Sequence, residues 1–572
     1  MRLFWVVVCA GALSAQQPIL YTHGSFNAAS FAPFGLPNAP IARGSVFTIT
    51  GENLGPAQGQ TATAYPLAAQ LAGVSISVTQ KGVVTAALPM SVSARQVYAL
   101  MPSSVKAGLA TLRLTYQASR GNAITIQIAD AAPGLFSVSG GGYGPGLIQN
   151  QLSADSSAAP APPAPVTAIG GYGPDLLQDT LNTQPLNSLT NPAVTGQAIT
   201  LWGTGLGAST APDESVPTSD SFPSVTVSIG GVPATPTSAG RASCCAGLDQ
   251  IVVTVPDAAP LGCWVPVIVK TGGGVSNTAT MAIAAPGATS CDDPGNPLSQ
   301  LVRTPGTQAF IHAERVDGIQ NANAPTPVHK VIDNLYSRFY TRPDSPFNFD
   351  PYLSYPPAGA CLVHQAAGDT FYDKTLRGAL PSSASLTPQP NQSYSNGDQV
   401  ISIVPQHAFF SSTIGGTIDS SPFALNLAVG NASLTIDPGG PDETALALNA
   451  EPPPAWMRPS TLLAVPRNQP LTLSFTPGDT LAPTAILLYS YAAATNSTVE
   501  VQCLAAPGAN TFTIPSDALA NLQPTYQIID GSYATLSIGT QGVNNATSFS
   551  NGLAASGILL NSSWLSQSVE LQ

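Results

Sequence analysis

The sequence predicts an all-β chain built from several β-sandwiches in tandem. Three observations carry this prediction. Short apolar or alternating segments recur about every eight to twelve residues, as the strands of a sandwich do. Glycine and proline, with 52 and 54 of the 572 residues, separate these segments. Two long segments also share one pattern, and the length of the chain suits about three or four structural units.

The first 15 residues predict a secretory signal peptide. One cation, Arg2, precedes an apolar run over residues 3–13, and small residues lead to a cleavage site after Ala15 or, as the alternative, after Ala12. No later segment has the roughly 18 apolar residues that a membrane-spanning helix needs. We therefore expect an exported protein, secreted or at the cell surface, with the periplasm as the alternative and no membrane insertion after signal removal.

Charged side chains are few and mostly acidic. Lysine and arginine number 18 against 30 aspartate and glutamate residues, so the net charge is −12, and charged residues make up 8% of the chain. About 25% is usual for a soluble domain. Such a surface lacks the basic patch that nucleic acids and anionic lipids require, so the sequence predicts neither partner.

Residues 43–57 and 195–209 share a frame of glycines. In both, an apolar run ends at a glycine and enters a turn, and we attribute the glycines to turns with positive φ. Neither segment leads into a helical pattern or carries a phosphate-loop lysine, so neither is a phosphate-binding loop. The match continues downstream, where "QVYALMP" corresponds to "QIVVTVP". The paired positions are Gly44 with Gly196, Gly51 with Gly203, Leu54 with Leu206 and Gly55 with Gly207.

This frame resembles the IPT/TIG immunoglobulin-like domain, in the form found in large secreted proteins of soil bacteria. The motifs are "NAASF" and "GxxxxxxGxxLG" in the first copy, and "NPA", "GTGLG" and "VSNTAT" in the second. The resemblance covers residues 22–288, about half of the chain. It implies tandem immunoglobulin-like β-sandwiches at 22–137 and 186–288 that serve as extracellular spacers or binding modules. It implies no catalytic residue.

Three further regions complete the predicted organisation. A Gly/Pro/Ala-rich connection at 138–185 joins the two sandwiches. A connector at 289–358 contains "TPVHKVIDNLYSRFY", whose helical spacing predicts one short amphipathic helix. Strand patterns return over 359–572 and predict a C-terminal β-sandwich domain. Its segments "RNQPLTLSFTPGD" and "FTIPSDALANL" resemble the module that often follows such repeats in the same secreted proteins.

Six cysteines remain after signal removal, and this even number in an exported chain predicts disulfides. A redox or zinc site would need a C-x-x-C pair or histidines near the cysteines. The sequence has no C-x-x-C pair and no histidine close to the first four of these cysteines, so it favours neither kind of site. In an extended segment neighbouring side chains point to opposite faces, so we expect the adjacent pair to bond to the next two cysteines separately. A vicinal bridge is the alternative, and the last two cysteines are expected to pair. The six candidates are Cys244, Cys245, Cys263, Cys291, Cys361 and Cys503.

No catalytic, cofactor-binding or metal-binding motif appears in the sequence. The acidic clusters at 292–293 and 437–443 fit no calcium-loop spacing. Residues 312–364 are densest in His, Asp, Tyr and Arg, and catalysis would be sought there first, with Asp344 and Asp350 as test positions.

The sequence as a whole favours a non-catalytic exported spacer, adhesion module or binder of polysaccharide or cell-envelope protein, without a cofactor. One alternative is a secreted carbohydrate-active enzyme or its accessory module, in which two carboxylates would face each other across a cleft. Another is a self-associating structural surface protein.

Overall fold

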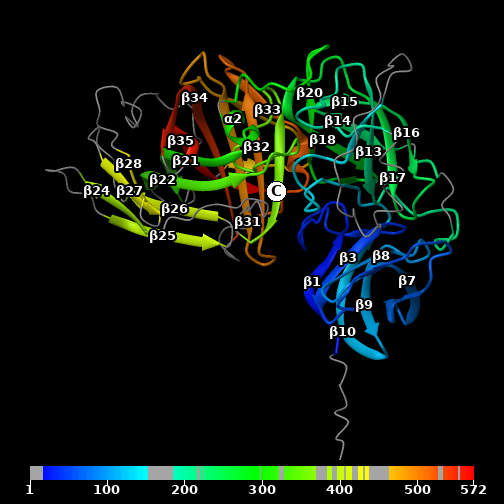
Figure 1. Ribbon diagram of the computed structural model, residues 1–572. Coiled ribbons are helices and arrows are strands. Elements are labelled where there is room, and N and C mark those ends of the chain that lie inside the picture. Colours follow the sequence, from blue (N-terminus) through cyan, green and yellow to red (C-terminus); the bar gives the residue numbers. More distant parts are fainter. Residues whose placement is uncertain are drawn as a thin grey trace, which may run out of the picture.

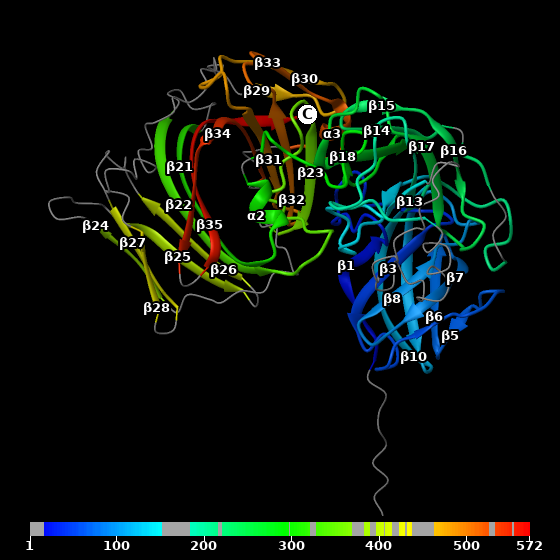
Figure 2. The same ribbon diagram turned by 45° about the horizontal axis from the view of Figure 1, so that its top comes forward.

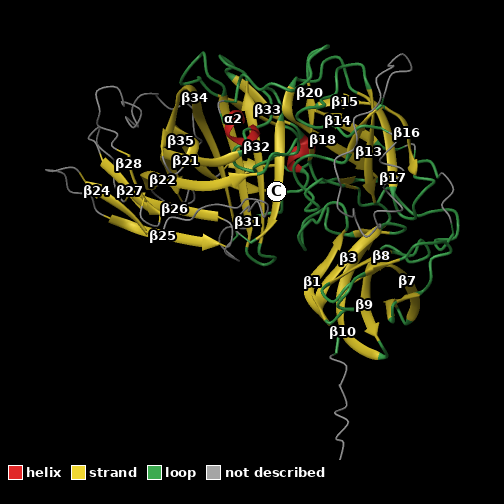
Figure 3. Ribbon diagram, in the orientation of Figure 1, coloured by secondary structure: helices red, strands yellow, loops and turns green. Residues whose placement is uncertain are grey.

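Strands dominate the computed structural model of the chain (Figures 1 and 3), which confirms the all-β class. The described part contains two short helices, α2 (Ser299–Arg303) and α3 (Ser516–Leu519). None of the helices described has the length and apolar character needed to cross a membrane. The structure describes residues 17–151, 184–215, 220–222, 224–296, 298–320, 328–368, 383–388, 396–404, 407–414, 423–429, 432–436, 463–525, 532–551 and 554–572.

The first sandwich is a two-layer unit in which one strand, β7, belongs to both layers. The first half of β7 pairs with β6, and its second half pairs with β8 after an irregularity between Pro89 and Ser91. Such a strand turns the corner between two sheets. The strands are β1 (Ile19–Asn27), β2 (Ile41–Ala42), β3 (Val46–Glu52), β4 (Gln60–Thr61), β5 (Gln70–Leu71), β6 (Val74–Gln80), β7 (Val83–Val92), β8 (Gln96–Leu100), β9 (Gly108–Tyr116) and β10 (Ser119–Ala129).

The second sandwich has two separate sheets with a shared apolar core. One sheet follows the order β11-β13-β17-β16 with β12 also on β13, and the other follows β15-β14-β18-β19 with β20 on β18. Leu201, Val227 and Val265 come from both sheets and are at most 3% exposed. The strands are β11 (Gly134–Leu135), β12 (Ile148–Asn150), β13 (Ala198–Thr204), β14 (Thr226–Ile229), β15 (Val232–Ala234), β16 (Pro236–Arg241), β17 (Asp249–Thr254), β18 (Gly262–Thr271), β19 (Gly274–Val275) and β20 (Ala279–Ile283).

The repeat seen in the sequence corresponds to equivalent strand pairs. The β3–β8 pair recurs as β13–β17, and the β6–β9 pair recurs as β14–β18. Gly44 and Gly196 have positive φ, as the turn interpretation requires. That interpretation is wrong for Gly51, Gly55 and Gly203, which lack positive φ. A Cβ on Gly51 or Gly203 would collide with the backbone of the neighbouring strand, β1 or β11, so close strand approach is what requires glycine at these two positions.

The C-terminal half forms a large curved sheet, which Figure 2 shows curling around α2. Its order is β23-β32-β31-β34-β35-β21-β22-β26-β25, with β29 also on β35. One face packs under α3 and the β30–β33 pair, and the other packs against α2. The strands are β21 (Gly306–Gln320), β22 (Val328–Arg342), β23 (Cys361–Ala367), β25 (Asn396–Val404), β26 (His407–Ile414), β29 (Leu463–Val465), β30 (Leu471–Ser474), β31 (Thr484–Ala492), β32 (Ser497–Ala505), β33 (Thr511–Ile514), β34 (Tyr533–Asn551) and β35 (Ala554–Leu571), beside a small sheet of β24 (Ser383–Pro388), β27 (Phe423–Val429) and β28 (Ala432–Ile436).

The prediction of an amphipathic helix in the 289–358 connector is wrong. Most of "TPVHKVIDNLYSRFY" lies in strand β22, which pairs with β21 on one side and β26 on the other. The segment is rich in β-branched and aromatic residues, which suit strands, and pairing on both sides outweighs the helical spacing. The connector does contain a short helix, α2, but at Ser299–Arg303.

The preferred pairing of the first four cysteines is also wrong. Cys244 bonds to Cys245, and Cys263 bonds to Cys291. The prediction assumed an extended segment, whereas both adjacent cysteines lie in the turn between β16 and β17. The vicinal alternative is the one observed. The pairing of Cys361 with Cys503 is confirmed, and these residues lie opposite each other on β23 and β32.

Three regions discussed above lie wholly or partly outside the described residues. They are the signal peptide at 1–15, the part of the connection over 152–183, and the acidic cluster at 437–443. Within the described part of the connection, β12 pairs with β13 of the second sandwich.

Candidate functional site

The first two sandwiches meet in a joint with a buried apolar core. Val46 and Leu100 of the first sandwich pack with Trp202 and Leu248 of the second in one buried cluster. All four are at most 5% exposed. An apolar core that crosses two units opposes hinge motion, because opening it would expose this surface to water.

Thr204, the last residue of β13, links the two backbones through its hydroxyl group. The hydroxyl donates to the carbonyl oxygen of Gly247 at 2.6 Å and accepts from the backbone N–H of Val46 at 3.0 Å. The residue is 1% exposed. Both backbone groups would otherwise be left unpaired in a buried place, so the side chain fixes the register of the two units.

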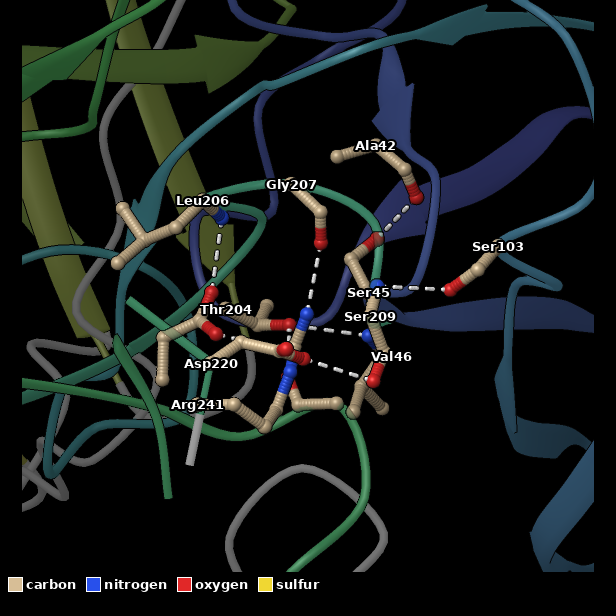
Figure 4. A network of polar contacts seen from close by, with 12 residues as sticks. Ala42, Ser45, Val46, Ser103, Thr204, Leu206, Gly207, Ser209, Asp220 and Arg241 are labelled. Atoms are coloured by element: carbon tan, nitrogen blue, oxygen red, sulfur yellow. Dashed lines mark hydrogen bonds and ion pairs between the residues drawn. The ribbon is translucent and has the colours of Figure 1, made fainter. Parts of the chain in front are cut away.

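Ser103 makes a second polar link at the edge of the joint (Figure 4). Its hydroxyl donates to Oδ1 of Asp213 at 2.6 Å, and its backbone N–H donates to Oδ2 at 2.7 Å. The same hydroxyl accepts from the backbone N–H of Ser209 at 2.9 Å. A loop of the first sandwich is therefore bonded to the segment that follows β13 in the second.

A buried ion pair lies under this network. Arg241 at the end of β16 faces Asp249 at the start of β17, with Nη1 and Oδ1 2.7 Å apart and both side chains 1% exposed. Nη2 of Arg241 donates to the carbonyl oxygen of Gly207, and Oδ2 of Asp249 accepts from the N–H of Leu206. Burial raises the pKa of Asp249 to about 6, although the Arg241 charge opposes the rise.

The turn that connects Arg241 to Asp249 carries the vicinal disulfide and inserts into the joint. The N–H of Ala246 donates to Oη of Tyr65 in the first sandwich at 2.7 Å. Gly247 has a φ of 76°, and a Cβ there would lie 2.9 Å from Cγ2 of Val46. Cys245 is fully buried and Cys244 partly buried in the same cluster. The sequence singled out these cysteines, but it gave no indication of what their turn contacts.

A second polar cluster lies where the curved sheet packs against the 342–355 segment. Arg342 and Asp350 form an ion pair at 2.8 Å, with both side chains 1% exposed. Burial lowers the pKa of His364 to about 4, and its ring lies 5.8 Å from that of Phe349. The predicted 312–364 region is thus partly brought together. Asp344 is exposed and outside this cluster.

Glu500 lies on the strand beside His364 of this cluster and was missed by the sequence analysis. It lies opposite His364 in the β23–β32 register, so both side chains point to the same face of the sheet. Burial raises the pKa of Glu500 to about 7, and no opposing cause accompanies it. The available signal was one charge within the apolar strand "STVEVQCLA", although the partner is far away in sequence.

Replacing Glu500 by glutamine is expected to change how stability depends on pH. The unfolded carboxyl loses its proton near pH 4.5 and the folded one near pH 7, so ionisation costs the native state stability across this window. We expect the free energy of unfolding of E500Q to rise relative to that of the wild type as pH increases from 4.5 to 7. The expected rise is roughly 2 kcal/mol, smaller than the pKa shift alone would give, because solvent screens a residue that is not fully enclosed. Urea unfolding at several pH values measures this difference.

Exposed Glu52 supplies the matched control for that experiment. Glu52→Gln makes the same chemical change on the surface, so its unfolding curve corrects for the loss of one carboxyl group from the chain. A difference from the wild type that stays constant with pH for E500Q would show that the Glu500 carboxyl is not desolvated.

The described part of the chain is an all-β protein of packed sandwiches and a large curved sheet. No family model matches the chain, and no curated protein matches it. Solved structures that match include the I9–I11 tandem from titin, at 8% identity over 69% of this chain and 93% of that chain, with a TM-score of 0.11. Domains 4–9 of the surface layer protein SbsC match at 12% identity over 65% of this chain, with a TM-score of 0.13.

These similarities carry no argument about architecture or role at such low TM-scores. The chain covers 39% of the SbsC structure and 96% of the titin I67–I69 fragment, which matches at 9% identity over 68% of this chain with a TM-score of 0.10. The all-β assignment depends on the strands themselves. Within the described ranges, no group of three or more His, Cys, Asp or Glu residues is arranged to hold a metal ion.

Proposed function

We propose that the chain is an exported, non-catalytic multidomain β protein that acts as a rigid extracellular spacer and presents a binding surface to polysaccharide or cell-envelope protein. The joint between the first two sandwiches carries this proposal. Its apolar core and the Thr204 links suit two units held in one orientation. Freely moving units usually share smaller and more polar contacts.

The C-terminal unit is tied to both sandwiches by specific bonds, which supports the same proposal. Nζ of Lys270 in the second sandwich lies 2.6 Å from Oδ1 of Asp517 in α3. Nε1 of Trp264 donates to the carbonyl oxygen of Asn348 at 3.3 Å. Asn38 of the first sandwich donates to Gln365 of β23 at 3.1 Å. A spacer with such contacts would hold its last sheet at a fixed distance from its first.

Export is supported by the cysteines and by the N-terminal pattern. All six cysteines outside the predicted signal peptide are paired in disulfides, which persist in oxidising compartments. The IPT/TIG resemblance over residues 22–288 implies the same location and a spacer or binding role. The low charge content of the chain favours partners recognised through hydroxyl and amide groups rather than through strong charge.

Thr204→Val is expected to loosen the joint. The substitution keeps the side-chain shape but leaves the Val46 N–H and the Gly247 carbonyl without their shared partner, at a cost of about 1–3 kcal/mol. Spin labels on the two sandwiches should then show a broader distance distribution than in the wild type. Thr237→Val is the matched control, because that exposed hydroxyl bonds only within the second sandwich, to Val252. A narrow distribution in both variants would show that the Thr204 bonds do not hold the joint, and a broad distribution in the wild type would argue against the rigid joint itself.

Binding is tested with the mature, oxidised protein on insoluble polysaccharides and cell-envelope fractions, with released reducing sugar assayed in the same tubes. Retention without sugar release is the result expected of a binding spacer. No retention on any surface would contradict the binding role, and concentration-dependent sedimentation would then favour the self-associating structural protein.

A carbohydrate-active enzyme is the second candidate, and the Glu500 carboxyl favours it. A carboxyl group whose pKa lies near 7 can act as a general acid at neutral pH. Sugar release that E500Q abolishes, while Asp344→Ala retains it, would select this candidate. Asp350→Ala is not a clean test, because it removes the buried partner of Arg342.

A further inference from the structure

The vicinal disulfide occupies an unusual place for a bond that joins neighbouring residues. Cys244 and Cys245 are one position apart, so their bond closes no loop between distant segments. In the chain-entropy model the stabilisation from a disulfide grows with loop length, and this bond contributes little to the stability of the whole fold. Its influence is confined to the turn between β16 and β17, which is the turn that enters the joint.

We propose that the Cys244–Cys245 disulfide is a redox-modification site whose reduction by a dithiol loosens the joint between the first two sandwiches. The inference rests on the proposed function, because it assumes that the oxidised joint is rigid. The substrate class is a small or protein dithiol that approaches from the side of Cys244, which is partly buried, since Cys245 is fully buried.

The turn is bonded on both sides, so its shape is transmitted to the joint. Within the turn, the N–H of Leu248 donates to the carbonyl oxygen of Cys245 at 3.1 Å, and the N–H of Ala242 donates to the carbonyl oxygen of Leu248 at 2.9 Å. Across the joint, the next residue, Ala246, bonds to Tyr65. The ring formed by the two cysteines and their peptide bond restricts the backbone angles that keep these bonds in place.

Gly247, which follows Ala246 in the turn, makes the joint sensitive to small movements. Gly247 packs so closely against Val46 and Leu100 that no side chain fits there, and its carbonyl accepts the Thr204 hydroxyl. A turn released from its ring would have to move within this tightly packed space, or move away from it. Either change breaks the bond between Gly247 and the Thr204 hydroxyl, the group that also accepts from Val46 of the first sandwich.

The chemistry is a two-electron thiol–disulfide exchange. A thiolate of the dithiol attacks Sγ of Cys244, the bond between the two cysteine sulfurs breaks, and Cys245 leaves as a thiolate that takes up a proton. The second thiolate of the reductant then attacks the mixed disulfide, closes the reductant's own disulfide and releases Cys244 as a thiolate, which is protonated. The dithiol is oxidised, and its two protons and two electrons end on the cysteines.

The other two disulfides provide an internal comparison. Cys263 and Cys291 are 2% and 1% exposed, and Cys361 and Cys503 are 4% and 0% exposed. Both bonds link distant parts of the chain, with sequence separations of 28 and 142. We therefore expect them to resist a reductant concentration that opens the vicinal bond.

The experiment titrates the full oxidised chain with dithiothreitol, alkylates free thiols and locates them by peptide mass spectrometry. Hydrogen exchange is followed in parallel. Cys244 and Cys245 should be alkylated first, and exchange in the 242–248 turn and at the Val46 amide of β3 should rise about tenfold, the effect expected from losing one buried hydrogen bond. Reoxidation with diamide should restore protection.

A variant separates the disulfide from other effects of the reductant. Cys244→Ala/Cys245→Ala should show the faster exchange without reductant and no further change on its addition. Unchanged exchange at the Val46 amide of β3, both in the reduced wild type and in this variant, would overturn the inference, as would earlier alkylation of the other four cysteines. If the Val46 amide already exchanges fast in the oxidised wild type, and the distance distribution between the sandwiches is broad, the rigid spacer itself fails. The two failures are therefore distinguishable.

Discussion

Replacing both Cys361 and Cys503 by alanine is expected to lower the free energy of unfolding of the C-terminal sheet by about 5 kcal/mol, because their bond closes the longest loop of the three. The two residues face each other on β23 and β32. Among the described strands β23 pairs only with β32, so the disulfide holds an end strand of the sheet. Guanidinium unfolding followed by circular dichroism measures the loss.

Removal of the shorter covalent link is the comparison for this result. Cys263 and Cys291 are 28 positions apart, so the same chain-entropy model gives about 3.5 kcal/mol for Cys263→Ala/Cys291→Ala. A smaller loss for the Cys361/Cys503 variant than for this one would mean that loop closure does not govern the stability of the C-terminal sheet.

Arg241→Met is expected to destabilise the second sandwich by about 3–5 kcal/mol at pH 7, because it leaves the Asp249 carboxylate buried without its partner. Burial already raises the pKa of Asp249 to about 6 in the presence of Arg241. Without the arginine the carboxyl should be neutral up to a higher pH. The loss should therefore shrink as pH falls from 7 to 5, and urea unfolding at both pH values tests this.

The ion pair between Arg43 and Asp130 is the surface control for this prediction. The Asp130 side chain is 74% exposed, and exposed pairs contribute about 0–1 kcal/mol. Asp130→Asn should thus change the free energy of unfolding by less than about 1 kcal/mol. An Arg241→Met loss of this small size would show that Asp249 finds water or another donor.

The sandwich strands could be predicted from the sequence because their signals are local. Val74, Ile76 and Val78 alternate with partly exposed residues along β6, so the period of two is visible in the letters themselves. Local periodicity gave the wrong structure for β22, because its apolar residues also fit a helical period. Only pairing with β21 and β26 selects the strand. Distant pairing is the information that local periodicity lacks.

The candidate sites were mostly beyond sequence reasoning for the same cause. Thr204 meets Val46 across 158 positions, and His364 meets Glu500 only when β23 is added beside β32. The cysteines were identified correctly as disulfide partners, but their pairing depended on whether Cys244 and Cys245 lie in a strand or a turn. One local conformation decided between the two alternatives.

The position of β35 has a consequence for the order in which the molecule can be completed. This strand pairs with β34 on one side and with β21, in parallel, on the other. One edge of β21 (Gly306–Gln320) therefore stays unpaired until Ala554–Leu571 has been synthesised. Contacts this distant in sequence form slowly, and open strand edges invite aggregation. A nascent chain would thus carry two finished sandwiches alongside an unfinished sheet, which is when it would most need a chaperone.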